Sequence, residues 1–267
     1  IIVLSNNDGC VIARSQDVKN LGIKMGVPWF RVQNFAKRHK IIVFSSNYTL
    51  YADMSNRVMK IISEFGPNQE VYSIDECFLD LTGFKHLGLT GYGQSIRSTI
   101  NRLVGLPVCV GVGASKTLAK LANHLAKKRP ILDGVCDLNT IKRDVLDSLF
   151  SKIEVREVWG VGRRIEKKLA KLGVNTVFDL KQSSPQALRK QFSVLMERTI
   201  RELNGESCIP LEEIAPLKKQ LVCSRGFGIP VSSLSELSEA VITYTTRVAE
   251  KLRRQRSVAA MVYIFIQ

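Results

Sequence analysis

The sequence has few of the residues that build zinc sites or disulfide frameworks. It contains three histidines and six cysteines, and the cysteines form no CxxC pair and follow no regular spacing. Closely paired cysteines are typical of zinc sites, and regularly spaced cysteines are typical of small secreted domains. We therefore interpret the cysteines as reduced core residues of a cytoplasmic protein.

The chain also lacks a long apolar run, an initiator methionine and a recognisable signal peptide. A membrane-spanning helix needs roughly 20 consecutive apolar residues, so we expect no membrane partner. Residues 1–4 and 261–266 both have the composition of β-strands. We expect that both ends are cut from something longer.

Acidic residues are outnumbered by basic ones. Lys and Arg total 39 and Asp and Glu total 24, which gives a formal charge of +15. Such an excess favours a polyanionic partner, of which nucleic acid is the commonest. With 267 residues and 45% hydrophobic content, the chain is long enough for one large domain or several small ones.

The most informative stretch is residues 71–81, where an adjacent acidic pair interrupts an apolar run. Residues 71–74 predict one β-strand and residues 78–81 the next, so Asp75 and Glu76 fall at the tight turn between them. Two carboxylates at the open end of a buried sheet repel each other unless a cation lies between them. Mg²⁺ takes hard oxygen ligands and shares them with substrate phosphates. The pair therefore predicts a magnesium site, with an exposed hairpin turn as the alternative.

A second stretch, residues 108–117, has the strand–turn–helix order of a phosphate-binding P-loop. The match fails because Ser115 precedes Lys116, where the P-loop pattern needs glycine, and we reject a Walker A site. Lys116, Lys120, Lys127, Lys128 and Arg129 predict a basic helix face. Such a face could bind phosphate, or it could simply be exposed to solvent.

The third stretch, residues 156–174, has the pattern of a helix-hairpin-helix: a helix, a Gly-Val-Gly hairpin, and a second helix that ends at Gly173. Two glycines let backbone amides face outward at a helix N-terminus, where they bind phosphate without reading the bases. We therefore predict binding to the DNA backbone, with a plain pair of helices as the alternative. The predicted DNA-binding residues are Gly160, Gly162, Arg163, Arg164 and Lys167.

The C-terminal part has the pattern of a small, incomplete α+β domain. Residues 205–219, with two prolines, predict a linker. A strand is expected at 221–224, and a capping-box pattern at Ser233 and Glu236 then starts a long helix.

Together these stretches resemble the Y-family translesion DNA polymerases, most closely the branch that includes the catalytic subunit of bacterial DNA polymerase V. The resemblance covers the whole chain in one order, and it implies the α+β fold of a right-hand polymerase. The implied parts are fingers at 1–46, a palm at 47–134 whose first strand is missing, a helical thumb with the helix-hairpin-helix at 135–216, and the start of a little finger at 217–267. The matching stretches are residues 3–14, 44–48, 51–58, 72–76, 116–124 and 159–168.

The resemblance also implies roles for single residues. Asp75 and Glu76 match the paired palm ligands of two Mg²⁺ ions in the complete enzyme. Lys127 matches a palm lysine that contacts the incoming triphosphate. Lys19 stands where many relatives have an arginine on the triphosphate, and Gln16 stands where they have a tyrosine.

The implied activity is error-prone, template-directed DNA synthesis past lesions in the bacterial SOS response. The implied partners are primer–template DNA and deoxynucleoside triphosphates and, in the complete protein, a processed UmuD-like dimer, RecA and the sliding clamp. The family's first palm strand carries a further metal-binding aspartate, which these residues lack. We therefore expect residues 1–267 alone to bind DNA without synthesising it.

Two alternatives stay open at this point. A helix-hairpin-helix DNA glycosylase places a catalytic aspartate after the hairpin in an apolar run followed by histidine, whereas Asp179 here has no such histidine. A non-catalytic DNA-binding fragment is the second alternative.

Overall fold

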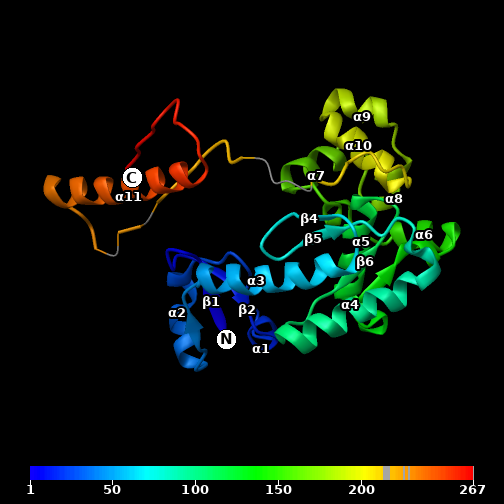
Figure 1. Cartoon of the computed structure of the whole chain (residues 1–267), viewed down its shortest axis with the longest axis horizontal. Helices are drawn as coiled ribbons and strands as arrows, with labels where there is room; N and C mark the ends of the chain where they lie inside the picture. The colour runs from blue at the N-terminus through cyan, green and yellow to red at the C-terminus, as the bar shows by residue number, and fades with distance from the viewer. Residues whose placement is uncertain (213–216, 225, 228, 267) are drawn as a thin grey trace. The chain divides into compact units, whose positions relative to one another are not determined.

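The computed structural model describes residues 1–212, 217–224, 226–227 and 229–266. The chain forms two compact units, one of residues 1–50 with 216–267 and one of residues 51–215 (Figure 1). Helices and short strands occur in one chain, which confirms the α+β class. The boundaries expected for fingers, palm, thumb and little finger stay predictions.

The N-terminal part of the first unit is a small sheet flanked by helices. Its strands lie in the order β2-β1-β3, with β1 antiparallel to β2 and parallel to β3. Alternate residues of β1, Ile2 and Leu4, are buried together with Val11 of β2, so one face of the sheet forms the core. The elements are β1 (Ile2–Leu4), β2 (Val11–Arg14), α1 (Gln16–Asn20), α2 (Trp29–Arg38) and β3 (Val43–Phe44).

The described residues of the C-terminal part of the first unit include one long helix, α11 (Leu234–Arg254). The hydroxyl of Ser233 caps it by accepting a hydrogen bond from the Glu236 backbone N–H at 3.2 Å. The strands predicted at 221–224 and 261–266 are wrong: neither segment forms a ladder within the described residues. A strand is stable only when a neighbour satisfies its backbone N–H and C=O groups.

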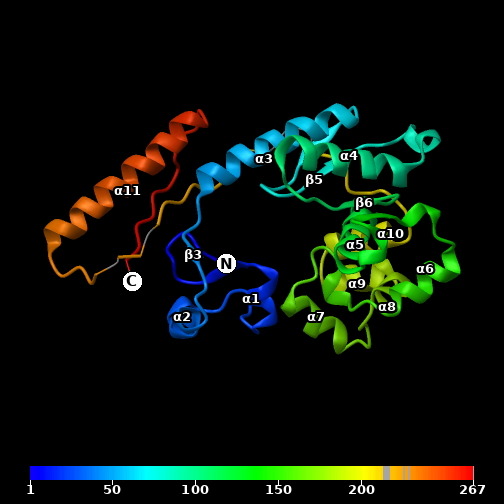
Figure 2. The same ribbon diagram turned by 90° about the horizontal axis from the view of Figure 1, so that it is seen from below.

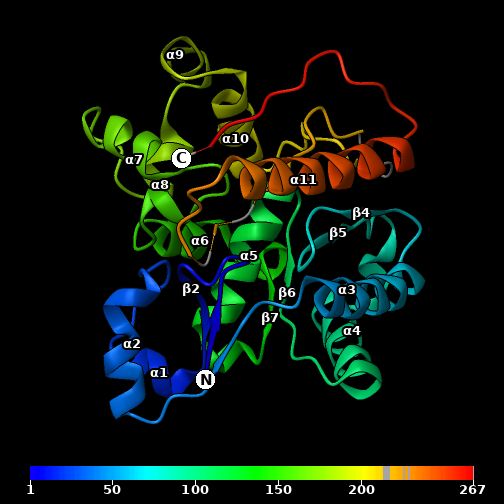
Figure 3. The ribbon, with the colours of Figure 1, turned by 90° about the vertical axis from the view of Figure 1, so that its left-hand side faces the viewer.

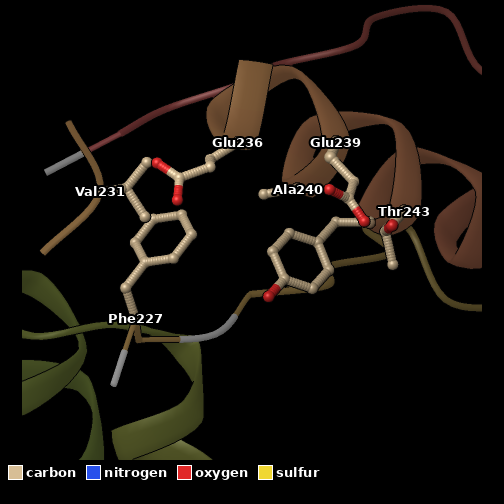
Figure 4. A pocket seen from close by; sticks show the side chains of 7 residues that line it. Phe227, Val231, Glu236, Glu239, Ala240 and Thr243 are labelled. Carbon is tan, nitrogen blue, oxygen red and sulfur yellow. The ribbon is translucent and has the colours of Figure 1, made fainter. Parts of the chain in front are cut away.

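A hollow of about 290 Å³ separates α11 from the segment before it (Figure 4). Rings of Phe227 and Tyr244 and carboxylates of Glu236 and Glu239 line it. No predicted site residue lies there.

The second unit begins with α3, which starts in the first unit, and its described residues form two separate strand pairs. β4 and β5 form an antiparallel hairpin, and β6 and β7 are parallel. α4 and α5 cover opposite faces of the β6–β7 pair (Figures 2 and 3). The elements are α3 (Tyr48–Ile62), β4 (Gln69–Val71), β5 (Cys77–Leu79), α4 (Leu89–Val104), β6 (Val110–Val112), α5 (Lys116–Lys128) and β7 (Val135–Asp137).

Two glycines of the β6 segment let α5 pack directly on the backbone of the strand. A Cβ atom at Gly111 would lie 2.2 Å from the backbone nitrogen of Asn123, and one at Gly113 would lie 2.7 Å from that of Ala119. Any larger side chain would push the helix away. This close packing fixes the position of α5 on the strand, and with it the positions of the lysines that the helix carries.

Among the residues that the structure describes, five further helices follow and share one hydrophobic core with α5. Phe150, Leu169, Leu180 and Ile200 are fully buried in it. The core therefore holds the helix-hairpin-helix region against α5 within this unit. The helices are α6 (Arg143–Phe150), α7 (Arg163–Ala170), α8 (Val177–Gln182), α9 (Pro185–Gln191) and α10 (Val194–Leu203).

Short 3₁₀ turns connect several of these elements. They are η1 (Ser63–Phe65), η2 (Phe84–Leu87), η3 (Pro130–Leu132), η4 (Leu138–Thr140) and η5 (Val155–Glu157). Among the described residues, none of the helices combines the length and the apolar character needed to cross a bilayer.

Candidate active site

The acidic pair lies at the turn of the β4–β5 hairpin, as the sequence predicts. The backbone N–H groups of Tyr72 and Ser73 both donate to the carbonyl of Glu76, at 3.1 and 3.0 Å. The Ser73 hydroxyl donates to the Asp75 carboxylate at 2.7 Å. These bonds bend the chain directly after Val71, so the strand predicted over 71–74 is wrong beyond that residue.

The turn opens into a cavity of about 1100 Å³ within the second unit. Its lining brings together three predicted site residues, Asp75, Glu76 and the exposed Lys127. Carboxylates and lysines thus share one open space, an arrangement suited to a metal ion and a phosphorylated substrate. The charged residues of the lining are Asp75, Glu76, Asp80, Lys85, Lys116, Lys120 and Lys127.

The carboxylates suit Mg²⁺ in their chemistry. Asp75 is exposed and Glu76 is half-buried at the edge of the cavity, and both offer hard oxygen ligands. Among the described residues no group of three or more His, Cys, Asp and Glu side chains could hold a metal ion. Mg²⁺ is commonly bound by one or two carboxylates and completes its shell with water and substrate phosphates.

Lys120 is the counter-ion of Glu76. Its Nζ lies 2.5 Å from the Glu76 Oε2 and 5.1 Å from the ring centroid of Tyr72. One turn earlier on α5, Lys116 is buried and pairs with Glu70 of β4, also at 2.5 Å. The prediction that Lys116 belongs to a solvent-facing or phosphate-facing basic surface is therefore wrong. Glu70 supplies its charge partner inside the protein.

The N-terminus of α5 is already occupied by a carboxylate of the protein. Glu202 of α10 is fully buried, and its Oε2 accepts from the Thr117 backbone N–H at 2.8 Å and from the Thr117 hydroxyl at 2.7 Å. Its Oε1 accepts from the backbone N–H of Ile209 at 2.9 Å. A helix N-terminus attracts an anion, and here the anion is internal, which agrees with the rejection of a Walker A site.

Sequence reasoning missed Glu70 and Glu202. Their partners lie 46 and 85 residues away along the chain. No local pattern marks such pairs. These two carboxylates also hold part of the predicted linker, because Glu202 binds Ile209 and Glu70 accepts from the Glu212 backbone N–H at 2.8 Å. Positions 213–216 of that linker lie outside the described residues.

The glycine hairpin presents the start of α7 to solvent. Gly160 has a φ of 86°, which favours glycine, and Gly162 has an extended φ of −88° and is the N-cap of α7. Val161 between them is buried and anchors the hairpin. The helix predicted before the hairpin is only the 3₁₀ turn η5.

The predicted DNA-binding residues lie together on this surface. Gly160 and Gly162 are exposed, as are Arg163, Arg164 and Lys167. Gly162 supplies no side-chain cap, so the first amides of α7 are available to an outside acceptor.

A hydrogen bond ties this hairpin to the acidic turn. The Trp159 Nε1 donates to the Tyr72 hydroxyl at 3.1 Å, and the two rings meet edge to face with centroids 5.4 Å apart. Lys19 lies exposed on α1 in the first unit, and its role in nucleotide binding stays a prediction.

Comparison with known proteins gives consistent matches. Residues 1–124 match the impB/mucB/samB family, residues 218–267 match the C-terminal domain of that family, and residues 156–203 match the thumb domain of DNA polymerase-iota. The whole chain is 50% identical to protein UmuC and 47% identical to protein ImpB, both of Salmonella typhimurium. It spans 63% of the length of each of these relatives.

A solved structure described as an insertion ternary complex of Dbh DNA polymerase has a similar fold. The TM-score is 0.63 at 23% sequence identity, over 76% of this chain and 58% of that one. At this identity the likeness concerns the fold, which agrees with the right-hand polymerase class predicted from the sequence.

Proposed function

The chain belongs to the impB/mucB/samB family, and from this premise we propose that it is the catalytic part of a DNA-directed translesion DNA polymerase. The proposed reaction is template-directed nucleotidyl transfer past DNA lesions, in the cytoplasm during the bacterial SOS response. The observation that carries the proposal is the cavity that joins Asp75 and Glu76 to the lysines of α5.

In this proposal Asp75 and Glu76 hold two Mg²⁺ ions, which would activate the primer 3′-hydroxyl and neutralise the pyrophosphate leaving group. Both carboxylates would supply oxygen ligands to these ions. Lys127 and Lys19 would bind the triphosphate by charge. The exposed amides of the α7 N-terminus would hold the duplex by its phosphates.

The two strand pairs of the second unit support the expectation that one catalytic aspartate is missing. Among the described strands, β5 pairs only with β4, and β6 pairs only with β7. Residues 75–83 and 107–116 both line the same cavity. From the family resemblance we expect a further strand that pairs with both and carries an aspartate toward Asp75.

The proposed partners follow from the same premise. They are primer–template DNA, deoxynucleoside triphosphates and, for the complete protein, a processed UmuD-like dimer, RecA and the sliding clamp. The charge of +15 supports the nucleic acid in particular.

The glycosylase alternative finds no support at Asp179. The Asp179 carboxylate accepts from the backbone N–H groups of Asn175 at 3.0 Å and Thr176 at 2.9 Å, and it completes the capping box of α8. Burial raises the pKa of Asp179, but these hydrogen bonds outweigh it and lower the pKa overall. The side chain therefore caps a helix.

DNA binding should be independent of base sequence and strongly dependent on salt. Each phosphate neutralised by a basic side chain should add about 0.9 to the slope of log K against log salt on duplex DNA. Fluorescence anisotropy on duplexes of two unrelated sequences between low and high salt measures this. Affinity that barely changes with salt, or that differs between the sequences, would contradict the prediction.

Blocking the glycine hairpin should weaken primer–template binding by about tenfold. Gly160→Val strains a backbone with a φ of 86°. Gly162→Val leaves an extended backbone unstrained, with nothing within 4 Å of the added Cβ, but covers the amides of α7. Both variants should lose DNA affinity in an anisotropy titration.

Gly173→Val is the matched control for this experiment. Gly173 also has a positive φ, of 78°, but lies beyond the C-terminal end of α7. It should lower the melting temperature and leave DNA affinity unchanged. Equal affinity losses in Gly160→Val and Gly173→Val, with unchanged affinity in Gly162→Val, would mean that backbone strain, rather than the amides, explains the effect.

A further inference from the structure

The carboxylate of Glu76 already has a cation bound to it within the chain. Lys120 contacts it at 2.5 Å, and both side chains are partly exposed at the cavity, Lys120 by 18% and Glu76 by 30%. A metal ion on Glu76 would have to share this carboxylate with an ammonium group. Two cations within about 4 Å of each other repel, so the ion and Lys120 compete.

The position of Lys120 is built into the fold. Its helix is fixed by the close packing on Gly111 and Gly113. Its ammonium lies 5.1 Å from the Tyr72 ring centroid, and that ring is held by the hydrogen bond from Trp159. The lysine is therefore preorganised toward Glu76.

The neighbouring lysine shows what a permanent structural pair looks like in this unit. Lys116 and Glu70 are 9% and 7% exposed, and the Lys116 Nζ also donates to the Pro210 carbonyl at 3.2 Å. Lys120 has greater access to solvent and faces the open cavity. Of the two pairs, only that of Lys120 and Glu76 includes a proposed metal ligand.

We propose that Lys120 is a positioning residue that holds Glu76 while the metal is absent and is displaced when a divalent cation binds. Lys120 thereby sets the metal affinity of the acidic turn. The inference rests on the proposed function, because that function makes Glu76 a metal ligand. It adds a residue that controls how readily the metal enters.

The test is Mn²⁺ binding by residues 1–267, followed through the electron paramagnetic resonance signal of free Mn²⁺, without DNA or nucleotide. Lys120→Met should bind Mn²⁺ about fivefold or more tightly, since the competing ion pair is lost. Lys120→Arg, which keeps the charge, should stay within about twofold of the unchanged chain. Lys128→Met is the matched control: it removes one charge from an exposed position of the same helix and should change little.

A second pair of variants separates competition from a general effect of charge. In a Glu76→Gln background, Lys120→Met should no longer tighten Mn²⁺ binding, because the contested carboxylate is gone. Thermal unfolding of each variant shows whether the fold is kept. A purely structural lysine would lower the melting temperature without tightening Mn²⁺ binding.

The inference is overturned if Lys120→Met binds Mn²⁺ no more tightly, if the gain persists with Glu76→Gln, or if no variant binds Mn²⁺. Failure of the polymerase proposal has a different signature, namely no primer extension by a chain completed to the length of its relatives. Primer extension together with an unchanged Mn²⁺ affinity in Lys120→Met would leave the proposed function in place and remove only the role of Lys120.

Discussion

Asp75→Asn, in a chain completed to the length of its curated relatives, should abolish Mg²⁺-dependent nucleotide incorporation and leave DNA binding nearly intact. The amide keeps the shape of the side chain and removes the charge that attracts the ions. Because the proposed transfer depends on the positive charge that those ions would supply, we expect a loss of at least about a thousandfold. The Ser73 hydroxyl that now donates to Asp75 can still donate to the amide oxygen, so the turn should keep its conformation.

Primer extension on an undamaged template measures the loss, and anisotropy measures DNA affinity on the same preparation. Asp144→Asn is the control, because Asp144 is an exposed residue in the first turn of α6 and does not line the cavity. It should extend primers at the unchanged rate. An Asp75→Asn chain that extends primers near the unchanged rate would show that Asp75 holds no metal, and the central proposal would be wrong.

The second large effect concerns the further palm strand that the family resemblance implies. Residues 1–267 alone should bind DNA without extending primers. A chain that also carries a family-like N-terminal strand with its aspartate, and a completed little finger, should extend them with Mg²⁺. Two-metal transfer needs carboxylates that converge on ions about 3.5–4 Å apart. Asp75 and Glu76 lie on the same turn, so they can reach such ions from one side only.

The matched control is the same completed chain with asparagine in place of the strand's aspartate. It should gain stability by pairing with β5 and β6 but should not extend primers. The shorter chain should also scatter more light on concentration, because unpaired strand edges favour association. Clear extension by residues 1–267 alone would contradict the prediction. DNA binding without extension by the completed chain would favour the non-catalytic alternative.

Much of the local structure could be predicted from the sequence because it depends on neighbouring residues. Ser233 caps α11, and its hydroxyl accepts from the Glu236 backbone N–H, as the capping-box pattern predicts. Ser115 caps α5, and its hydroxyl accepts from the Leu118 backbone N–H. The acidic turn could be predicted for the same reason, because hydrogen bonds among the five consecutive residues 72–76 hold it closed.

Other local predictions failed where a partner was needed. The segments 221–224 and 261–266 have strand composition, but within the described residues no neighbouring strand pairs with them. Composition indicates what a segment can form, and a pairing partner decides whether it forms.

The sequence by itself determined the acidic turn, the glycine hairpin, the helix caps and the excess of positive charge. Only the tertiary structure decided which charged side chains are buried in ion pairs and which face the cavity. Lys116 and Lys120 look equivalent in sequence, one turn apart on the same helix. One is buried against Glu70 and the other holds Glu76 at the cavity. The physical reason is that an ion pair depends on what packing brings within a few ångströms, and these partners lie 46 and 44 residues away along the chain.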